Sequence, residues 1–403
     1  MQTSEFRKEW EIMDIKTLAQ ETEAYIIERR RFYHTCPEPS KQEKETRAHI
    51  KADLEALGIT EIVEMKTCYG LTAMIRGGKP GKTVALRTDI DALSVKETTG
   101  LPFASKNEGF MHACGHDNHI AILLGAAKML QSMKDELCGN VKLIVQPEEE
   151  TATGALSMSK EGAVDDVDAI YGGHVWGDFD APKFIVTPGN NMACCHGFKI
   201  EVEGASAHAS APHLGIDAIM AAVAIATNLQ QVVSRMNNPI NPLVLTIGTI
   251  HGGDRWNVLP GHCTMEGTVR TFRMDKVVEE QMRKVIETTA EGLGAKASLE
   301  YTYMTLPVIN SDPLLNRVAH DAVVKLYGED SVTTAPPMTG AEDFSWFGEK
   351  VPYFYGFIGS RNRDKGLVAT NHNDKYDVDE SILQRAAAVM TQFAVDYLKA
   401  TAQ

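Results

Sequence analysis

The 403-residue chain has no segment that suits a membrane span or a secretion signal. No stretch approaches the roughly 18–20 apolar residues of a transmembrane helix, and the first 16 residues are charged throughout, without an apolar core of the signal-peptide type. The seven cysteines are odd in number and irregularly spaced, which excludes a small disulfide scaffold and fits a reducing compartment. These absences predict a cytoplasmic protein.

Positive charge is also scarce. Lysine and arginine total 40 residues against 54 aspartates and glutamates, which gives a formal net charge of −14. Such a chain is not expected to bind nucleic acid or an anionic membrane surface. The sequence has no GxxxxGK[ST] motif and no convincing GxGxxG after a strand, which argues against a nucleotide-dependent enzyme.

Two kinds of hydrophobic pattern divide the chain, whose length suggests two domains. Strands alternating with helices in the first 190 residues, and again after Pro307, predict an α/β domain with a largely parallel sheet flanked by helices. Strands that alternate apolar and polar residues between these parts predict a separate, inserted α+β domain. The expected helices are 14–34, 43–57, 119–133, 216–234 and 275–293. The expected strands are 72–76, 84–87 (after a turn at 79–82), 142–145, 168–174, 198–204, 243–250 and 263–272.

The most informative segment is 111–119, MetHisAlaCysGlyHisAspAsnHis, which leads directly into an apolar helix. Cysteine thiolate and histidine nitrogen are ligands for borderline metals such as Zn²⁺, Co²⁺ or Mn²⁺. Three histidines and a cysteine within eight residues favour a metal site. The alternative is a loop with a core cysteine and polar groups that cap the helix.

Other segments add metal-binding side chains. Three adjacent glutamates, 148–150, follow a buried strand and repel each other unless a cation, protonation or solvent relieves them. His174 ends the next strand, and His372 lies in a polar loop. Taken alone, a run of acidic residues is more often a solvated loop than a metal site, and a single histidine is more often structural than a ligand. Because open α/β sheets bind ligands beyond the carboxyl ends of their strands, the segments together match a metallohydrolase.

Polar side chains near two further strands complete the candidates. Asp89 or Asp91 could accept the second N–H of a metal-bound histidine, although a turn-forming pair is the competing interpretation. In the inserted block, His208 stands among small residues that permit a close approach, or else it is an exposed histidine on a packed turn. Asn257 and Arg270 belong to the same polar set.

In this order, the segments resemble the peptidase family of hippurate hydrolase, bacterial aminoacylases and plant auxin-conjugate amidohydrolases. The resemblance runs from ArgArgPheTyrHisThrCysProGlu at 30–38 to the terminal AsnHis, and its most specific part is the pair HisAlaCysGlyHisAsp and GlnProXaaGluGlu. It implies a catalytic metal-binding domain formed by 1–190 and 306–403. It also implies that 191–305 form an inserted lid domain, often used for dimerisation.

The resemblance further implies two divalent metal ions per subunit, Mn²⁺, Zn²⁺ or Co²⁺, and assigns roles to site residues. Glu149 would be the general base, with Asp91 as the supporting aspartate. His208 would polarise the scissile carbonyl, often in the partner subunit's site, while Asn257 and Arg270 would lie near the substrate carboxylate. The implied metal ligands are Cys114, His116, Glu150, His174 and His372.

The implied reaction is hydrolysis of the amide bond of a small N-acyl amino acid by a homodimer or higher homo-oligomer. A dipeptidase or aminopeptidase with the same metals is one alternative, although a free substrate amine would need an acidic partner in the pocket. A non-catalytic metal-binding regulatory protein is another. Loss of Glu149 or of a ligand would indicate that second alternative, and none is lost.

Overall fold

The computed structural model describes residues 14–402, so the expectation for the charged N-terminal segment lies largely outside the described residues. The chain divides into two compact units. The first contains Met1–Pro188, Asn310–Ala335 and Phe347–Gln403, and the second contains Gly189–Ile309 and Pro336–Trp346. Across the described part of the chain, no helix has the length and apolar character needed to cross a membrane.

A sheet of eight strands forms the centre of the first unit, in the order β1-β2-β4-β3-β5-β16-β6-β15. The four central strands β4, β3, β5 and β16 run parallel. The second halves of β3 and β4 are continuously buried, as expected where helices cover both faces of a parallel sheet. The strands are β1 Glu61–Glu64, β2 Leu71–Ile75, β3 Lys79–Asp89, β4 Cys138–Gln146, β5 Ala169–Asp180, β6 Phe184–Ile185, β15 Val332–Thr333 and β16 Tyr353–Arg361.

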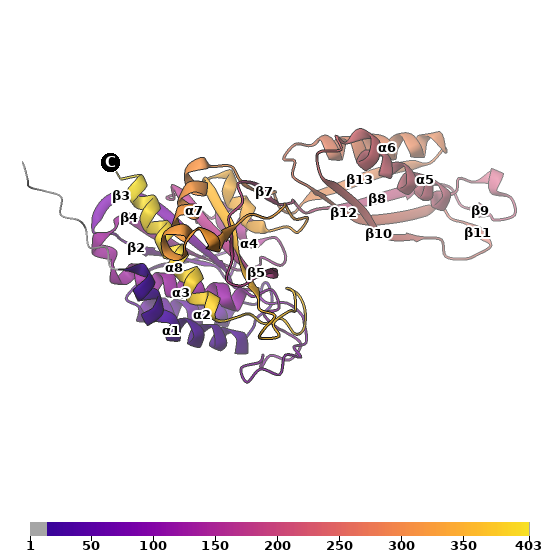
Figure 1. Cartoon of the computed structure of the whole chain (residues 1–403). Helices are drawn as coiled ribbons and strands as arrows, with labels where there is room; N and C mark the ends of the chain where they lie inside the picture. Colours follow the sequence, from indigo (N-terminus) through magenta and orange to yellow (C-terminus); the bar gives the residue numbers. More distant parts are fainter. Residues whose placement is uncertain (1–13, 403) are drawn as a thin grey trace, which may run out of the picture. The chain divides into compact units, whose positions relative to one another are not determined.

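Three helices pack on one another and against this sheet (Figure 1). These are α1, α3 and α8, of which α3 and α8 contact β3 directly. The side chain of Asp14 caps α1 by accepting a hydrogen bond from the Lys16 backbone N–H. The helices of this unit are α1 Ile15–Thr35, α2 Lys44–Ala56, α3 His116–Ser132, α4 Gly154–Lys160, α7 Pro313–Tyr327 and α8 Ser381–Ala400.

The turn expected at 79–82 is wrong. These residues begin strand β3, whose pairing with β4 shifts register between Lys79 and Thr83. A bulge of this kind accommodates Pro80, which has no N–H to give to the ladder, and Gly81. The turn composition therefore marked an irregularity within a strand.

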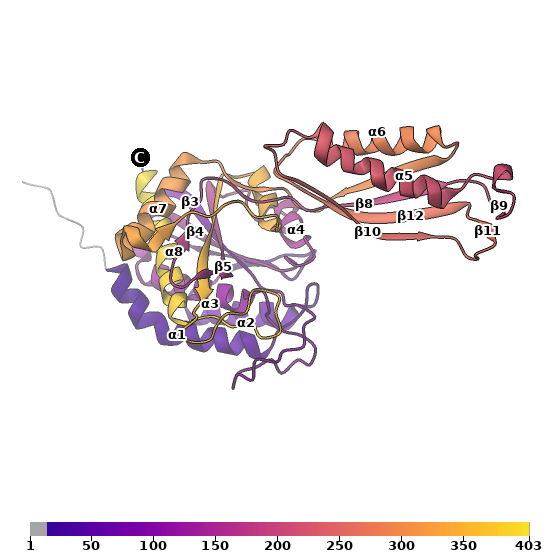
Figure 2. The ribbon, with the colours of Figure 1, turned by 45° about the vertical axis from the view of Figure 1, so that its right-hand side comes forward.

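The second unit is an antiparallel sheet covered by two helices. Its order is β10-β12-β8-β13, and α5 and α6 lie side by side on the sheet (Figure 2). The outer strand β13 was not among the expected strands, although Ala297, Leu299 and Tyr301 alternate with polar residues. The elements are β8 His196–Glu203, β10 Leu243–Gly252, β12 His262–Thr271, β13 Lys296–Tyr303, α5 Ala218–Gln231 and α6 Val277–Gly292, with the short pairs β9 Ala207–His208 and β11 Val258–Leu259, and β7 Gly189–Met192 and β14 Val308–Asn310.

The mixed α/β architecture with a largely parallel, helix-flanked sheet confirms the predicted fold class. One segment lies elsewhere than expected: Pro336–Trp346 belongs to the second unit. The backbone N–H of Met338 donates to Asn191 O at 2.8 Å, and Ala193 N–H donates to Met338 O at 3.0 Å. This pairing joins residues about 145 positions apart, so no local pattern reveals it.

Candidate metal centre

The polar segments of the first unit meet at the carboxyl edge of its parallel strands. Asp89 and Gln146 are the last residues of β3 and β4, and they are paired in register. The last residue pair of β3 with β5 is Leu86 with Tyr171, and three further residues along both strands set His174 level with Asp89 on the same edge. This is the edge at which open α/β sheets place their ligands.

A glycine brings the start of α3 against this edge. Gly115 precedes His116 and has a φ of 99°, in the left-handed region that favours glycine. A Cβ at this position would lie 2.7 Å from Val175 Cγ2. Only glycine therefore lets the helix approach β5 closely, which carries His116 and Cys114 towards His174.

Five side chains from four segments converge here. Cys114 Sγ lies 3.3 Å from His174 Nε2 and 3.3 Å from His372 Nε2. Glu150 Oε1 lies 3.7 Å from His372 Nε2 and 3.9 Å from His116 Nε2. The structure thus brings together every side chain that the family resemblance implied as a ligand: Cys114, His116, Glu150, His174 and His372.

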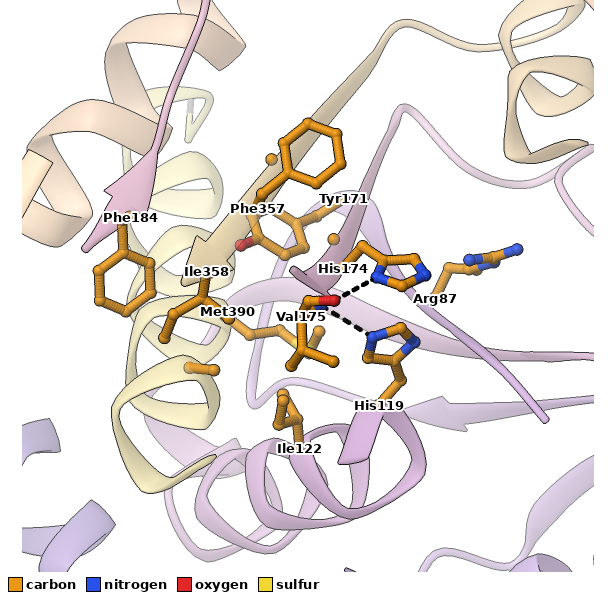
Figure 3. Close-up of a pocket in the computed structure, with 13 residues that line it drawn as sticks. Arg87, His119, Ile122, Tyr171, His174, Val175, Phe184, Phe357, Ile358 and Met390 are labelled. Carbon is orange, nitrogen blue, oxygen red and sulfur yellow. Dashed lines mark hydrogen bonds between the residues drawn. The ribbon is translucent and has the colours of Figure 1, made fainter. Parts of the chain in front are cut away.

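Hydrogen bonds orient the histidine rings so that the Nε2 atoms face the cluster. His116 Nδ1 donates to the Asp91 carbonyl at 2.9 Å, and His174 Nδ1 donates to the Val175 carbonyl at 2.6 Å. His119 is different because its Nε2 accepts from the Val175 N–H and its Nδ1 donates to Asp89 at 2.6 Å. Figure 3 shows the hydrogen bonds that His174 and His119 make with the backbone of Val175. A hydrogen bond from the other ring nitrogen fixes the tautomer of a metal-binding imidazole, whereas His119 has both nitrogens in use.

The donor set fits divalent metal ions. His116 Nε2 and Glu150 Oε1 are buried and make no hydrogen bond to any group within residues 14–402. Burying such atoms without a partner is costly, and a bound cation removes that cost. Thiolate, imidazole and carboxylate together are the ligand types of zinc and similar transition metals.

The electrostatics of the cluster point the same way. Burial raises the pKa of Glu150 to about 7, and burial together with Glu150 and Glu149 raises the pKa of the Cys114 thiol well above its usual value. Burial lowers the pKa of His116, but Asp89 and Asp91 outweigh it and raise that pKa to about 10. Acidic groups packed this closely ionise together only with a compensating positive charge.

Two buried carboxylates hold the turn that carries Glu149 and Glu150. Glu43 accepts a hydrogen bond from the Glu148 backbone N–H at 2.9 Å, and Asp91 Oδ2 accepts one from the Glu150 N–H at 3.0 Å. Glu148 has a φ of 59°, which is uncommon outside glycine. An oxygen of Glu149 lies within 4.8 Å of donor atoms of His116 and Glu150. The turn therefore places a carboxylate beside the candidate ligands.

Glu43 was not predicted as a functional residue, and its position leads to a prediction. Glu43→Ala removes a buried acceptor and leaves the Glu148 N–H without its hydrogen-bond partner. We therefore expect the free energy of unfolding to fall by about 1–3 kcal/mol. Displacement of the turn should also lower kcat by about 10–100-fold. Glu43→Gln keeps the acceptor oxygen and should stay near wild type in both thermal unfolding and kcat. Equal losses in the two variants would contradict this role.

The cavity in Figure 3 lies behind the ligands and is small. It has a volume of about 30 Å³ and is lined by His119, His174 and Arg87 among others. A single water needs about 10–15 Å³ of such volume. The cavity admits water but not a substrate, so a substrate must reach the cluster from another side.

In the second unit, the structure brings His208 and Asn257 close together. Ala209 N–H donates to the Asn257 carbonyl at 3.2 Å, and His208 is paired with Val258 across β9 and β11. The ring of His208 is exposed, and its Nδ1 accepts hydrogen bonds from the backbone N–H and the hydroxyl of Ser210 at 3.1 and 2.8 Å. A neutral ring in this state carries its proton on Nε2, which can donate to another molecule.

Arg270 lies far from this pair. It is the ninth residue of β12, next to the last, whereas His262 begins that strand just beyond β11. At about 3.3 Å per residue, the eight steps separate them by roughly 26 Å. Within one second unit, the three polar residues of the inserted block therefore do not form one site.

Comparison with known proteins adds family information. The model of peptidase family M20/M25/M40 matches residues 85–396. The chain is 38% identical over 393 residues to N-acetyl-L-cysteine deacetylase of Bacillus subtilis, covering 94% of this chain and 92% of the relative. It is 37% identical over 388 residues to thermostable carboxypeptidase 2 of Saccharolobus solfataricus, covering 95% and 98%.

A solved structure is similar over almost the same extent. The YXEP protein of Bacillus subtilis, described as a dinuclear metal-binding peptidase of family M20, superposes with a TM-score of 0.84 at 35% identity. The alignment covers 94% of this chain and 99% of that protein.

Proposed function

This chain belongs to peptidase family M20/M25/M40, and from that membership we propose that it hydrolyses the amide bond of small N-acyl amino acids. Membership confirms the family resemblance of the sequence motifs, and the chain is a metal-dependent amidohydrolase. The observation that carries the proposal is the convergence of five donor side chains with the Glu149 carboxylate at one edge of the sheet.

Cys114, His116, Glu150, His174 and His372 would hold two divalent cations. When bound, such a pair lowers the pKa of water towards about 7 and polarises the scissile carbonyl. Asp91 positions two of the ligands. Its backbone carbonyl orients the His116 ring, and its carboxylate accepts a hydrogen bond from the Glu150 backbone N–H. His372 is exposed while Cys114, His116 and His174 are buried, so the cluster opens on the His372 side.

Glu149 is the proposed general base. Its carboxylate lies beside the candidate ligands without belonging to the five, which suits a group that accepts a proton from the attacking water. The same carboxyl group would return that proton to the leaving amine. Glu148, the neighbouring acid, is engaged elsewhere because its carboxylate accepts the Thr153 hydroxyl at 2.5 Å.

The inserted unit supplies the remaining proposed roles. His208 would donate from Nε2 to the developing oxyanion, and Asn257 and Arg270 would bind the substrate near its carboxylate. Since Arg270 lies roughly 26 Å along β12 from His262, at the end of the strand that follows β11, one second unit does not offer all three residues to one small substrate. We propose that His208 and Asn257 serve the site of the partner subunit in a homodimer.

An open sheet edge in this unit supports the dimer. Strand β10 is one of the two edge strands of the four-stranded sheet, opposite β13. It exposes Val244 and Ile250, and α5 exposes Met220 and Val223. Unpaired strand edges with exposed apolar neighbours are surfaces on which another chain pairs. Light scattering should give a dimer for the wild type and a monomer for Met220→Asp combined with Val223→Asp.

A substrate panel tests the proposed reaction. N-acetyl, N-butanoyl and N-benzoyl amino acids, unblocked dipeptides and N-blocked dipeptides should be incubated with the enzyme loaded with Mn²⁺, Zn²⁺ or Co²⁺. We expect the N-acyl amino acids to be hydrolysed fastest. The similarity to thermostable carboxypeptidase 2 makes carboxypeptidase activity the second candidate. Preferential cleavage of N-blocked dipeptides would favour that activity, and preferential cleavage of unblocked dipeptides would contradict both.

The thiol of Cys114 gives a further prediction. As a metal ligand it should be alkylated slowly in the loaded enzyme and faster after chelation. Cys68 is also buried but lies outside the cluster, so its labelling should be insensitive to the chelator. Because burial raises both thiol pKa values, labelling is best followed by peptide mass spectrometry at about pH 9. Equal labelling of Cys114 in both states would exclude coordination.

A further inference from the structure

We infer that Asn371 is a positioning residue of the metal centre, which holds the loop of His372 against the segments that carry other candidate ligands. Asn371 directly precedes His372 in the chain and is not one of the five candidate ligands. The inference rests on the two-metal site of the proposed function, and it names a side chain on which the geometry of that site depends.

The side chain of Asn371 joins the loop to two other parts of the chain. Its Nδ2 donates to the Cys114 carbonyl at 2.8 Å and to the Val175 carbonyl at 3.1 Å. Its Oδ1 accepts from the Gly177 backbone N–H at 2.9 Å. A side chain of this shape makes all three bonds only as an amide, because the two carbonyls need donors and the N–H needs an acceptor.

Both carbonyl acceptors lie in the backbone of the ligand segments. Cys114 is itself a candidate ligand, and the Val175 carbonyl also accepts the hydrogen bond that orients the His174 ring. The His372 backbone N–H donates to the Ala113 carbonyl at 2.7 Å. Two consecutive residues of the loop are therefore fixed to consecutive peptide groups of the segment whose thiol must meet the histidine.

His372 needs such support more than a ligand in a helix or strand. It lies in a turn, its side chain is exposed, and its φ of 68° is uncommon outside glycine. A backbone in this conformation persists when the surrounding structure holds it. The loop also packs closely on β5, since a Cβ on Gly177 would lie 2.9 Å from the Ala369 carbonyl oxygen and 3.0 Å from Thr370 Cα.

The donor atoms form two groups that share the Cys114 thiol. The groups are Cys114, His116 and His174, and Cys114, Glu150 and His372. Asn371 bears most directly on the second group, because it precedes His372 and holds the Cys114 backbone. Loss of its hydrogen bonds should therefore weaken the binding of one metal ion more than that of the other.

Asn371→Asp tests the inference in the full chain with Co²⁺ alone. The substitution keeps the shape and the bond from Gly177, but it turns an acceptor oxygen towards the carbonyls of Cys114 and Val175. We expect chelator competition to show one of two Co²⁺ ions bound about 10–100-fold more weakly. The thiolate-to-Co²⁺ absorption band should also change, which loss of a bond that only stabilises the fold would not cause.

Asn373→Asp is the matched control. It makes the same chemical change two residues later in the same loop, where the side-chain oxygen accepts from the Lys375 backbone N–H at 2.9 Å. Because an aspartate retains that acceptor, this variant should bind both Co²⁺ ions as the wild type does. Asn371→Ala removes the two donors without adding a charge and should weaken the same ion as Asn371→Asp.

Melting temperatures of the metal-free proteins identify a variant that fails to fold, and Asn371→Ala decides the question if Asn371→Asp does not fold. Folded Asn371 variants that bind both Co²⁺ ions as tightly as the wild type, with an unchanged absorption band, would overturn the inference. Equal weakening of both ions together with a lower metal-free melting temperature would also overturn it, because that pattern indicates a general loss of structure. A wild-type chain that binds fewer than two Co²⁺ ions would refute the two-metal site of the proposed function, and the inference with it.

Discussion

Glu149→Gln should lower kcat by about 10²–10⁴-fold while the protein keeps its full metal content. The substitution preserves size and leaves the neighbouring ligand atoms in place, but an amide cannot accept the proton of the attacking water. Activity on an N-acetyl amino acid and elemental analysis of the same preparation measure the two quantities together.

The turn provides its own control. Glu148→Gln makes the same chemical change one residue earlier, in a side chain that bonds to Thr153 and does not face the cluster. It should keep kcat near wild type. A Glu149→Gln enzyme that remains active at full metal occupancy would show that another group is the base. A loss shared equally by both variants would indicate a disturbed turn instead.

His208→Ala should lower kcat by about 10²–10³-fold with little change in metal binding or melting temperature. The ring is exposed and its hydrogen bonds are local to Ser210, so its removal creates no cavity in the core. A histidine that only stabilises its own hairpin would show the opposite pattern, with a lower melting temperature and unchanged turnover.

Mixing the two inactive proteins distinguishes donation within a chain from donation to a partner. If His208 serves the partner's site, a mixed dimer of His208→Ala and Glu149→Gln has one site with both groups intact. Equal mixing should restore about a quarter of wild-type activity, because half of the dimers are mixed and half of their sites are complete. Subunit exchange must be shown independently by tag pull-down. Confirmed mixed dimers that stay inactive would rule out donation to the partner.

Local patterns were sufficient to predict five of the eight α-helices and seven of the sixteen strands within the described residues. The helices at 14–34 and 43–57 and the strands at 142–145 and 243–250 lie within one to four residues of the observed bounds, because their periodicity is carried by neighbouring residues. Two of the failures have non-local causes. Residues 79–82 have turn composition but are held in β3 by pairing with β4, and Pro336–Trp346 joins the second unit through contacts with residues 191–193.

The same distinction applies to the site. The segments with Cys114, Glu150, His174 and His372 were recognisable because each combines unusual chemistry with a strand end or loop. Glu43 was not recognisable, because in the sequence it looks like a solvated acid before a helix. Its partner Glu148 lies 105 residues further along the chain. The residues alone left the choice between Asp89 and Asp91 open, and the family resemblance assigned the supporting role to Asp91. The fold places Asp89 on His119 and Asp91 against His116 and Glu150.

The length of β12 has a consequence for how the activity would depend on abundance. If its two ends serve different active sites, a monomer has an incomplete active site and does not turn over substrate. The turnover per chain then depends on the concentration of the protein. By mass action, output should then rise more steeply than expression at low copy number and become proportional to it once association is complete. A strand of ten residues would in this way give the hydrolase a threshold of expression below which it is silent.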